Sequence, residues 1–172
     1  WGLKACKYLE GMWSFSYYNI NNKTMWLSRD RFGEKPLYYL QNNNEFIYAS
    51  EIKYIESISQ KKLNIDMDKI KNFLKYGYRS VFLKNPSFIK NVKSVKAGTI
   101  LIIKKAKIIK KENYFKFEKP QINNFSEKYF IKNLRERLLS SISIRLRSDT
   151  DLAICLSGGV DSNILVNIIK KY

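Results

Sequence analysis

A glycine-rich loop near the end of the chain combines hydroxyls, adjacent glycines and a carboxylate at a spacing that suits phosphate chemistry. Its residues are Leu156, Ser157, Gly158, Gly159, Val160, Asp161 and Ser162. Adjacent glycines can adopt positive φ and let the backbone approach an anion closely. Ser157 and Ser162 place a hydroxyl on either side, and Asp161 adds the carboxylate with which a Mg²⁺–nucleotide site holds its metal. The loop is therefore a candidate site for Mg²⁺ and the phosphates of a nucleotide.

The sequence on either side of this loop predicts the elements that position it. An apolar run over residues 152–156 precedes the loop, and a largely apolar stretch over residues 164–169 follows it. We interpret this as a buried strand, a glycine turn and the start of a helix. The N-terminus of such a helix presents backbone N–H groups and the positive end of its dipole to an anion. Cys155 is then expected to pack in the strand as a small apolar residue.

The loop pattern has a structural alternative and a family resemblance. A strand-to-helix turn whose serines cap the helix would also explain Ser157, Gly158 and Gly159. A Walker A loop would not, because its spacing and its lysine are absent from the sequence of the loop. Asp161 and Ser162, following an apolar run, favour phosphate binding. The pattern resembles the pyrophosphate-binding loop of the PP-loop ATP pyrophosphatases, which split ATP into AMP and pyrophosphate to activate a carboxylate or carbonyl.

The first part of the chain predicts antiparallel strands joined by turns. Aromatic and β-branched residues, which suit packed sheets, surround turn-rich segments at residues 19–23 and 42–44. Arg29, Asp30 and Arg31 precede Gly33 and could form either a catalytic constellation or a structural turn. We favour the turn, with Asp30 accepting backbone N–H bonds and the two arginines paired with carboxylates. Glu51 is expected to open a short helix, because a carboxylate is favourable at a helix N-terminus.

Two further helices and a joint follow from the sequence. Residues 66–76 predict an amphipathic helix that Gly77 ends. The polar segment 120–124 predicts a domain boundary, and a long helix is expected over about 126–147 with Ser126 as its N-cap. Its apolar stripe comprises Phe130, Ile131, Leu134, Leu138, Leu139 and Ile142. The arginines of this helix either lie on its solvated or carboxylate-paired side, or, for Arg145 or Arg147, face the nucleotide.

Several motifs in order resemble the glutamine-hydrolysing asparagine synthetases. They are G-M-x-x-F from Gly11, R-D-R-F-G-x-K-P-L-Y-Y from Arg29, A-S-E-I-K from Ala49 and S-G-G-x-D-S from Ser157. The resemblance implies that residues 1–117 are the C-terminal part of a type-2 glutamine amidotransferase domain, the α+β antiparallel-sheet portion of an Ntn-type glutaminase. Residues 118–172 would then be the start of the synthetase domain, opening with the first strand, loop and helix of an α/β PP-loop fold like that of the adenine nucleotide alpha hydrolases.

The resemblance also implies a reaction and a set of ligands. Enzymes of this ligase family release ammonia from glutamine, adenylate the side chain of aspartate with ATP, and let the ammonia displace AMP to give asparagine. The implied cofactors are ATP and Mg²⁺, and the implied partners are small molecules: ATP, aspartate and glutamine. A homodimer of the full-length protein is compatible with the family. The ATP and pyrophosphate contacts fall on Leu156, Ser157, Gly158, Gly159, Asp161 and Ser162, with Asp161 on the metal and Leu156 against the adenosine.

No residue of this chain matches the family's glutaminase nucleophile, which is an N-terminal cysteine. The chain begins with Trp1, and we interpret Cys6 as an ordinary helix or loop residue, because the sequence contains no His beside it or elsewhere. We therefore expect no catalytic residue here and no activity from these residues alone. Two alternatives to a partial asparagine synthetase stay open: an inactive product of a split or broken gene, and a relative that amidates another carboxylate.

The strongly basic composition has two interpretations. The formal net charge is +17 with a pI near 9.8, which suits either nucleic-acid binding or solvated lysine-rich faces. The lysines are scattered, and their densest run, Lys104 to Lys111, falls at an expected hairpin. We therefore expect neither a nucleic-acid nor a membrane partner, since no apolar run is long enough to span a bilayer. The two cysteines show no metal spacing, and a reduced cytoplasm is the expected compartment.

Overall fold

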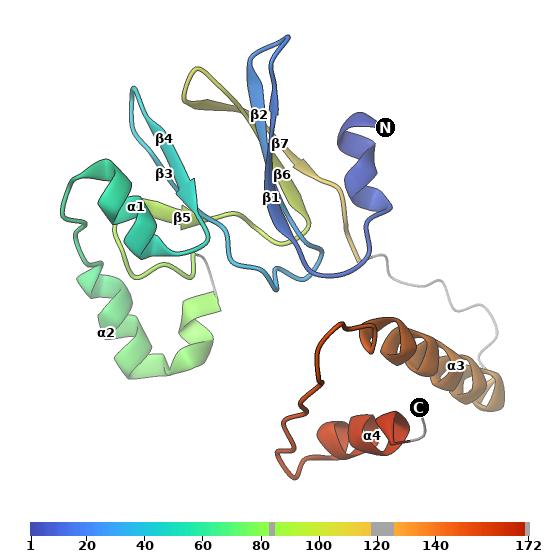
Figure 1. Ribbon diagram of the computed structural model, residues 1–172. Coiled ribbons are helices and arrows are strands. Elements are labelled where there is room, and N and C mark those ends of the chain that lie inside the picture. The colour runs from blue at the N-terminus through green and yellow to red at the C-terminus, as the bar shows by residue number, and fades with distance from the viewer. Residues whose placement is uncertain (83–84, 118–125, 171–172) are drawn as a thin grey trace. The chain divides into compact units, whose positions relative to one another are not determined.

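The computed structural model describes residues 1–82, 85–117 and 126–170, and it divides the chain into two compact units. Unit 1 comprises Trp1–Phe117 and unit 2 comprises Glu118–Tyr172. The polar joint expected at residues 120–124 lies outside the described residues. Figure 1 shows all the labelled strands in the part of the chain that forms unit 1, whereas unit 2 is drawn with helices alone.

Unit 1 contains two antiparallel sheets. The larger has the strand order β1-β2-β6-β7 and the smaller has the order β4-β3-β5. The strands of the larger sheet are β1 (Ser14–Asn19), β2 (Thr24–Arg29), β6 (Thr99–Lys104) and β7 (Lys107–Asn113). Those of the smaller are β3 (Tyr38–Gln41), β4 (Phe46–Ala49) and β5 (Val92–Ser94). The predicted antiparallel pairings, both turn segments and the lysine-rich hairpin are confirmed.

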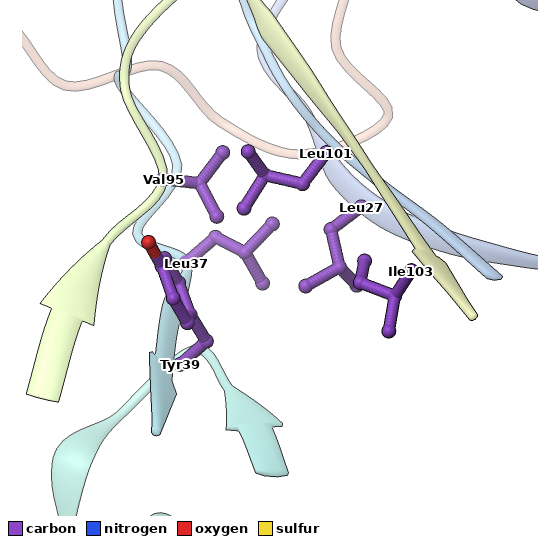
Figure 2. Packing of buried hydrophobic residues seen from close by; sticks show 6 residues of the cluster. All are labelled: Leu27, Leu37, Tyr39, Val95, Leu101 and Ile103. Atoms are coloured by element: carbon purple, nitrogen blue, oxygen red, sulfur yellow. The ribbon is translucent and has the colours of Figure 1, made fainter. Parts of the chain in front are cut away.

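The two sheets pack against each other through a shared core. Leu27 and Leu101 reach this core from the larger sheet and Tyr39 from the smaller, as Figure 2 shows. A second cluster lies on the other face of the larger sheet and includes Cys6 of the short 3-10 helix η1 (Gly2–Lys7). A third cluster joins the other face of the smaller sheet to Ile55 of helix α1 (Ile52–Ser59). Unit 1 is therefore layered, with a helical segment against the outer face of each sheet.

The remaining helices of unit 1 begin and end where their capping residues predict. Helix α2 (Met67–Tyr76) starts at Asp66, whose side chain accepts a hydrogen bond from Lys69 N at 3.1 Å. It ends at Gly77, where φ is +73°. Glu51 takes the N-cap position of α1 as predicted, although its carboxylate pairs with Lys53 at 2.7 Å and does not cap the helix. A 3-10 turn, η2 (Tyr78–Phe82), follows α2.

Unit 2 consists, in its described part, of two helices. Helix α3 (Glu127–Arg145) is capped by Ser126, which accepts a hydrogen bond from Tyr129 N at 3.5 Å. Helix α4 (Val160–Ile169) begins at the glycine-rich loop as predicted. Of the apolar stripe predicted on α3, Ile142 is buried. Phe130, Ile131 and Leu134 are exposed, and Leu138 and Leu139 are half-buried, so the N-terminal half of the stripe does not face a core within the described part of unit 2.

The predicted strand at residues 152–156 is wrong for this chain. These residues form no regular structure, and Leu152 is 52% and Ile154 is 42% exposed. Cys155, expected in a buried strand position, is also exposed. An isolated strand leaves its backbone groups and both faces in water, and the described part of unit 2 contains no strand that could pair with this run. The loop and the helix of the predicted strand-loop-helix unit are thus present without the strand.

Candidate functional site

The glycine-rich loop places two glycines with different backbone conformations before helix α4. Gly158 has φ +81°, a conformation that favours glycine. A Cβ atom on Gly158 would meet nothing within 4 Å, so backbone conformation and not crowding accounts for this glycine. Gly159 occupies the N-cap position with extended backbone, and the helix has no side-chain hydrogen bond capping its N-terminus. The first N–H groups of α4 are therefore without a side-chain cap.

The two serines of the loop bond elsewhere. The hydroxyl oxygens of Ser157 and Ser162 lie 3.2 Å apart, within hydrogen-bond distance. Ser162 Oγ also donates to the Gly159 carbonyl at 3.0 Å, and Asn163 Nδ2 donates to the same carbonyl at 2.9 Å. The alternative in which the serines serve as helix caps is thus wrong. The structure brings both hydroxyls to the start of the helix while leaving its N–H groups uncapped.

Asp161 lies in the first turn of α4, where a carboxylate is favourable beside the helix dipole whatever else it binds. Across residues 1–82, 85–117 and 126–170, no three His, Cys, Asp or Glu side chains come together in a group that could hold a metal. Mg²⁺ commonly takes only one or two carboxylates and fills its remaining positions with water and substrate phosphates. Asp161 therefore fits a Mg²⁺ ion that arrives with phosphates, and does not fit a metal held by protein ligands alone.

A hollow of about 410 Å³ lies beside the loop, along one side of α4. Gly158, Val160, Asn163 and Ile164 are among the residues that line it. Leu156 precedes the loop and is exposed. The six residues predicted for nucleotide binding lie at or shortly before the exposed N-terminus of α4, and of these six Gly158 alone lines the hollow.

The second candidate constellation, around Asp30, is a structural turn. Asp30 is 1% exposed, and its carboxylate accepts hydrogen bonds at 3.0 Å from the backbone N–H groups of Phe32, Glu34 and Lys35. Burial on its own would raise the pKa of Asp30, but these donors outweigh it and lower the pKa below its ordinary value. The prediction that Asp30 accepts backbone N–H bonds is confirmed.

The two arginines of this turn have different partners. Arg31 Nη1 pairs with Glu10 Oε1 at 2.7 Å, as predicted. Within the described residues Arg29 pairs with no carboxylate, so the prediction is wrong for this arginine. Its guanidinium donates to the carbonyls of Lys35 and Val95, at 2.7 and 2.8 Å. It also donates to the Gly33 carbonyl and to the Ser94 hydroxyl. Burial lowers the pKa of Arg29, although Tyr38 and Asp30 act in the opposite direction. Arg29 thus ties the turn to the segment after β5, a role that its sequence neighbours did not indicate.

Cys6 has a structural place in the fold. It is buried in η1, and its sulfur lies 3.4 Å from the hydroxyl oxygen of Ser28 on β2. The interpretation of Cys6 as an ordinary helix residue is confirmed. No helix in the described ranges is long and apolar enough to cross a membrane.

Comparison with known proteins matches both units of the chain. A family model described as "Glutamine amidotransferase domain" matches residues 1–115, and one described as "Asparagine synthase" matches residues 133–172. The chain is 33% identical over 177 residues to a putative glutamine-hydrolysing asparagine synthetase 2 of Methanocaldococcus jannaschii, covering 99% of this chain and 33% of the relative. It is 30% identical over 170 residues to glutamine-hydrolysing asparagine synthetase 1 of Bacillus subtilis, covering 98% of this chain and 26% of the relative.

A fungal protein is similar over the same span. Amidase chry2 of Gibberella zeae is 29% identical over 186 residues, which is 99% of this chain and 25% of the amidase. The chain thus spans a third or less of the length of these relatives. With one model matching most of unit 1 and a second matching unit 2 in the expected order, the chain belongs to the family of glutamine-hydrolysing asparagine synthetases.

Proposed function

We propose that the loop from Leu156 to Ser162 binds the phosphates of ATP together with Mg²⁺, as part of an ATP-dependent amidation of aspartate to asparagine. The observation that carries this proposal is the N-terminus of α4, which lacks a side-chain cap and follows a glycine at positive φ. Uncapped N–H groups at the positive end of a helix dipole favour an anion. Membership of the asparagine synthetase family supplies the nucleotide as the source of that anion.

The proposal gives the residues of the loop distinct roles in binding. Backbone N–H groups of the first turn of α4 donate to phosphate oxygens, and the conformation of Gly158 opens the approach to them. The hydroxyls of Ser157 and Ser162, now within hydrogen-bond distance of each other, turn to donate to the phosphates. Asp161 holds Mg²⁺ from the first turn, and Leu156 contacts the adenosine. When bound, the metal neutralises charge on the phosphates.

We propose the rest of the reaction for the protein on the strength of its family. Unit 1 belongs to the domain that supplies ammonia from glutamine, and the second unit opens the domain that forms the β-aspartyl adenylate, which that ammonia then converts to asparagine. The cytoplasm is the proposed compartment. Because Cys6 is buried against Ser28, we propose that it does not serve as the glutaminase nucleophile. We propose that the 172 residues alone catalyse neither half of the reaction.

A second candidate is amidation of a different carboxylate. It is favoured by the matches to amidase chry2 of Gibberella zeae, at 29% identity, and to amidase chyE of Penicillium rubens, at 27%. Aspartate-dependent exchange of pyrophosphate into ATP, measured on a protein that contains this chain and a complete synthetase half, separates the two candidates. Exchange with aspartate supports asparagine synthesis, and exchange only with another carboxylic acid supports the alternative.

The loop assignment is tested on the chain itself by titration with ATP and Mg²⁺, followed by amide-resolved NMR. We expect the resonances of Gly158, Gly159 and Val160 to move, and to move more with Mg²⁺ than without it. Asp161→Asn should remove most of the Mg²⁺ dependence. Asp149→Asn, which makes the same charge change outside the loop, should leave it intact. Loop resonances that stay still at saturating nucleotide would refute the assignment.

A further inference from the structure

A cleft of about 670 Å³ opens along one edge of unit 1, between the two sheets. Its walls come from the edge strands β5 and β7 and from the segments that follow each of them. Four lysines line it: Lys93, Lys96, Lys111 and Lys116. Every residue in its wall belongs to unit 1, so the cleft includes no residue of the glycine-rich loop.

The strand register directs two of these lysines toward the space between the sheets. Lys93 is the cross-strand partner of Tyr39, and Lys111 is the partner of Leu101. Directly paired residues on neighbouring strands project from the same face of a sheet. Tyr39 and Leu101 both belong to the core between the sheets, so Lys93 and Lys111 lie on the core-facing side of their edge strands, where both side chains are exposed. Alternation along an ordinary sandwich strand would place apolar side chains there.

The cleft carries positive charge that the protein itself does not neutralise. Within the described part of the chain, no ion pair involves any of the four lysines. The one carboxylate in the wall, that of Glu112, is already paired with Lys110 at 2.9 Å. Clefts lined by one sign of charge concentrate ions of the opposite sign. A multiply charged anion is the ligand that this wall complements.

A tyrosine hydroxyl at the cleft wall adds a hydrogen-bond donor. Tyr39 forms part of the cleft wall and is only 5% exposed, with its ring stacked on Phe46 at 5.3 Å between centroids. In the described residues no protein group bonds its hydroxyl, and that oxygen is not among the fully buried unpartnered atoms, so it is open to the cleft. A ligand in the cleft could therefore accept a hydrogen bond from it. Burial raises the pKa of Tyr39, which keeps the phenol neutral and able to donate.

We propose that this cleft binds a small phosphorylated molecule, with the lysines neutralising its phosphates and the Tyr39 hydroxyl donating to one of their oxygens. The volume lies within the range of small-molecule pockets. Phosphate is favoured over carboxylate because the charged wall holds lysines and no arginine. Lysine binds phosphate as a point charge, whereas planar two-point recognition of carboxylates is typical of arginine. Inward-facing lysines also discourage edge strands from pairing with other chains, but that role requires neither Tyr39 nor a ligand.

The test is titration of the 172-residue chain with inorganic pyrophosphate, followed by amide-resolved NMR so that each site reports separately. We expect saturable shifts at Lys93, Ser94 and Asn113. Lys93→Gln and Lys111→Gln should each weaken binding at these resonances by about fivefold, and high salt should weaken it further. The matched controls Lys4→Gln and Lys62→Gln remove the same charge from exposed positions of unit 1 and should change affinity by less than about twofold.

Tyr39→Phe keeps the packed ring, removes only the hydroxyl and should weaken binding by about fivefold. Thermal unfolding of every variant verifies that the fold is retained. If a lysine variant does not fold, the affinity of Tyr39→Phe still tests the proposal. Three results would overturn the proposal: equal losses in the control variants, unchanged affinity in Tyr39→Phe, or citrate or a short oligonucleotide binding as tightly as pyrophosphate. Shifts confined to Gly158 and Gly159 would also overturn it, while supporting the nucleotide loop of unit 2.

Discussion

Two apolar runs of similar composition lie in different units of the chain and have opposite surroundings. The run from Ile100 to Ile103 forms most of β6, and each of its residues is buried. The run at residues 152–156 forms no strand and is exposed. Strand β6 has β2 and β7 as hydrogen-bonded neighbours, a second sheet on one face and the cluster around η1 on the other. What makes an apolar run into a buried strand is therefore the presence of partners on its edges and faces.

This comparison is sharpened most strongly by removing the same side chain from each run. Ile100 is 1% exposed and Ile154 is 42% exposed. Ile100→Ala should lower the free energy of unfolding by about 3–4 kcal/mol, because it loses buried contacts and leaves a cavity. Ile154→Ala should change it by less than about 0.5 kcal/mol. Denaturant unfolding followed by tryptophan fluorescence and by circular dichroism measures both, and equal losses would mean that the second run is buried in solution.

The next largest effect is expected from the buried carboxylate of the Arg29–Asp30 turn. Asp30→Ala removes the buried carboxylate that accepts three part-buried backbone N–H groups and should cost about 3 kcal/mol. All three tryptophans lie in unit 1, so their fluorescence reports unfolding of that unit alone. Asp68→Ala is the matched control, since that side chain is exposed and its one ion pair spans 3.8 Å. A loss below about 1 kcal/mol for Asp30→Ala would contradict the role assigned to this turn.

Features that depend on nearby residues were predictable from the sequence, and features that depend on distant residues were not. The Asp66 cap, the Gly77 stop and the hairpin after Lys104 each rest on neighbours within a few positions. Arg29 is different, because it donates to Ser94, which lies 65 residues away, and no local pattern indicates that partner. The glycine-rich loop was recognised from its own residues. The apolar run before it predicted a strand from its own residues, but a strand forms only where neighbouring strands pair with it.

Glycines at positive φ extend the comparison between the units. Gly33 has φ +70°, and a Cβ there would lie 3.2 Å from both Ala97 Cβ and Arg29 Cζ. Gly158 has φ +81° and open space around it. Gly33→Ala should therefore cost about 2 kcal/mol or more through strain and crowding, and Gly158→Ala about 1 kcal/mol through strain alone. Tryptophan fluorescence measures the first variant, and loss of helical circular dichroism on heating measures the second.

A larger loss of stability in Gly158→Ala than in Gly33→Ala would contradict the roles assigned to these two glycines. It would mean that the crowding around Gly33 relaxes freely, or that the space around Gly158 is filled in solution. A second measurement separates strain from lost binding at the loop. If Gly158→Ala leaves the melting of α4 nearly unchanged but abolishes nucleotide-induced NMR shifts, backbone approach to the phosphates is the main duty of this glycine.

The smallest expected effect comes from titrating Asp30. Its pKa is lowered in the folded state, so the folded protein holds its carboxylate ionised at pH values where the unfolded chain has begun to bind a proton. Its contribution to stability is therefore fully present above the unfolded pKa of about 4 and is lost as the pH falls through the lower, folded pKa. Asp30→Asn should flatten the acid limb of a plot of unfolding free energy against pH, measured by tryptophan fluorescence. An acid limb of unchanged slope in Asp30→Asn would assign the pH dependence of unit 1 to its other carboxylates.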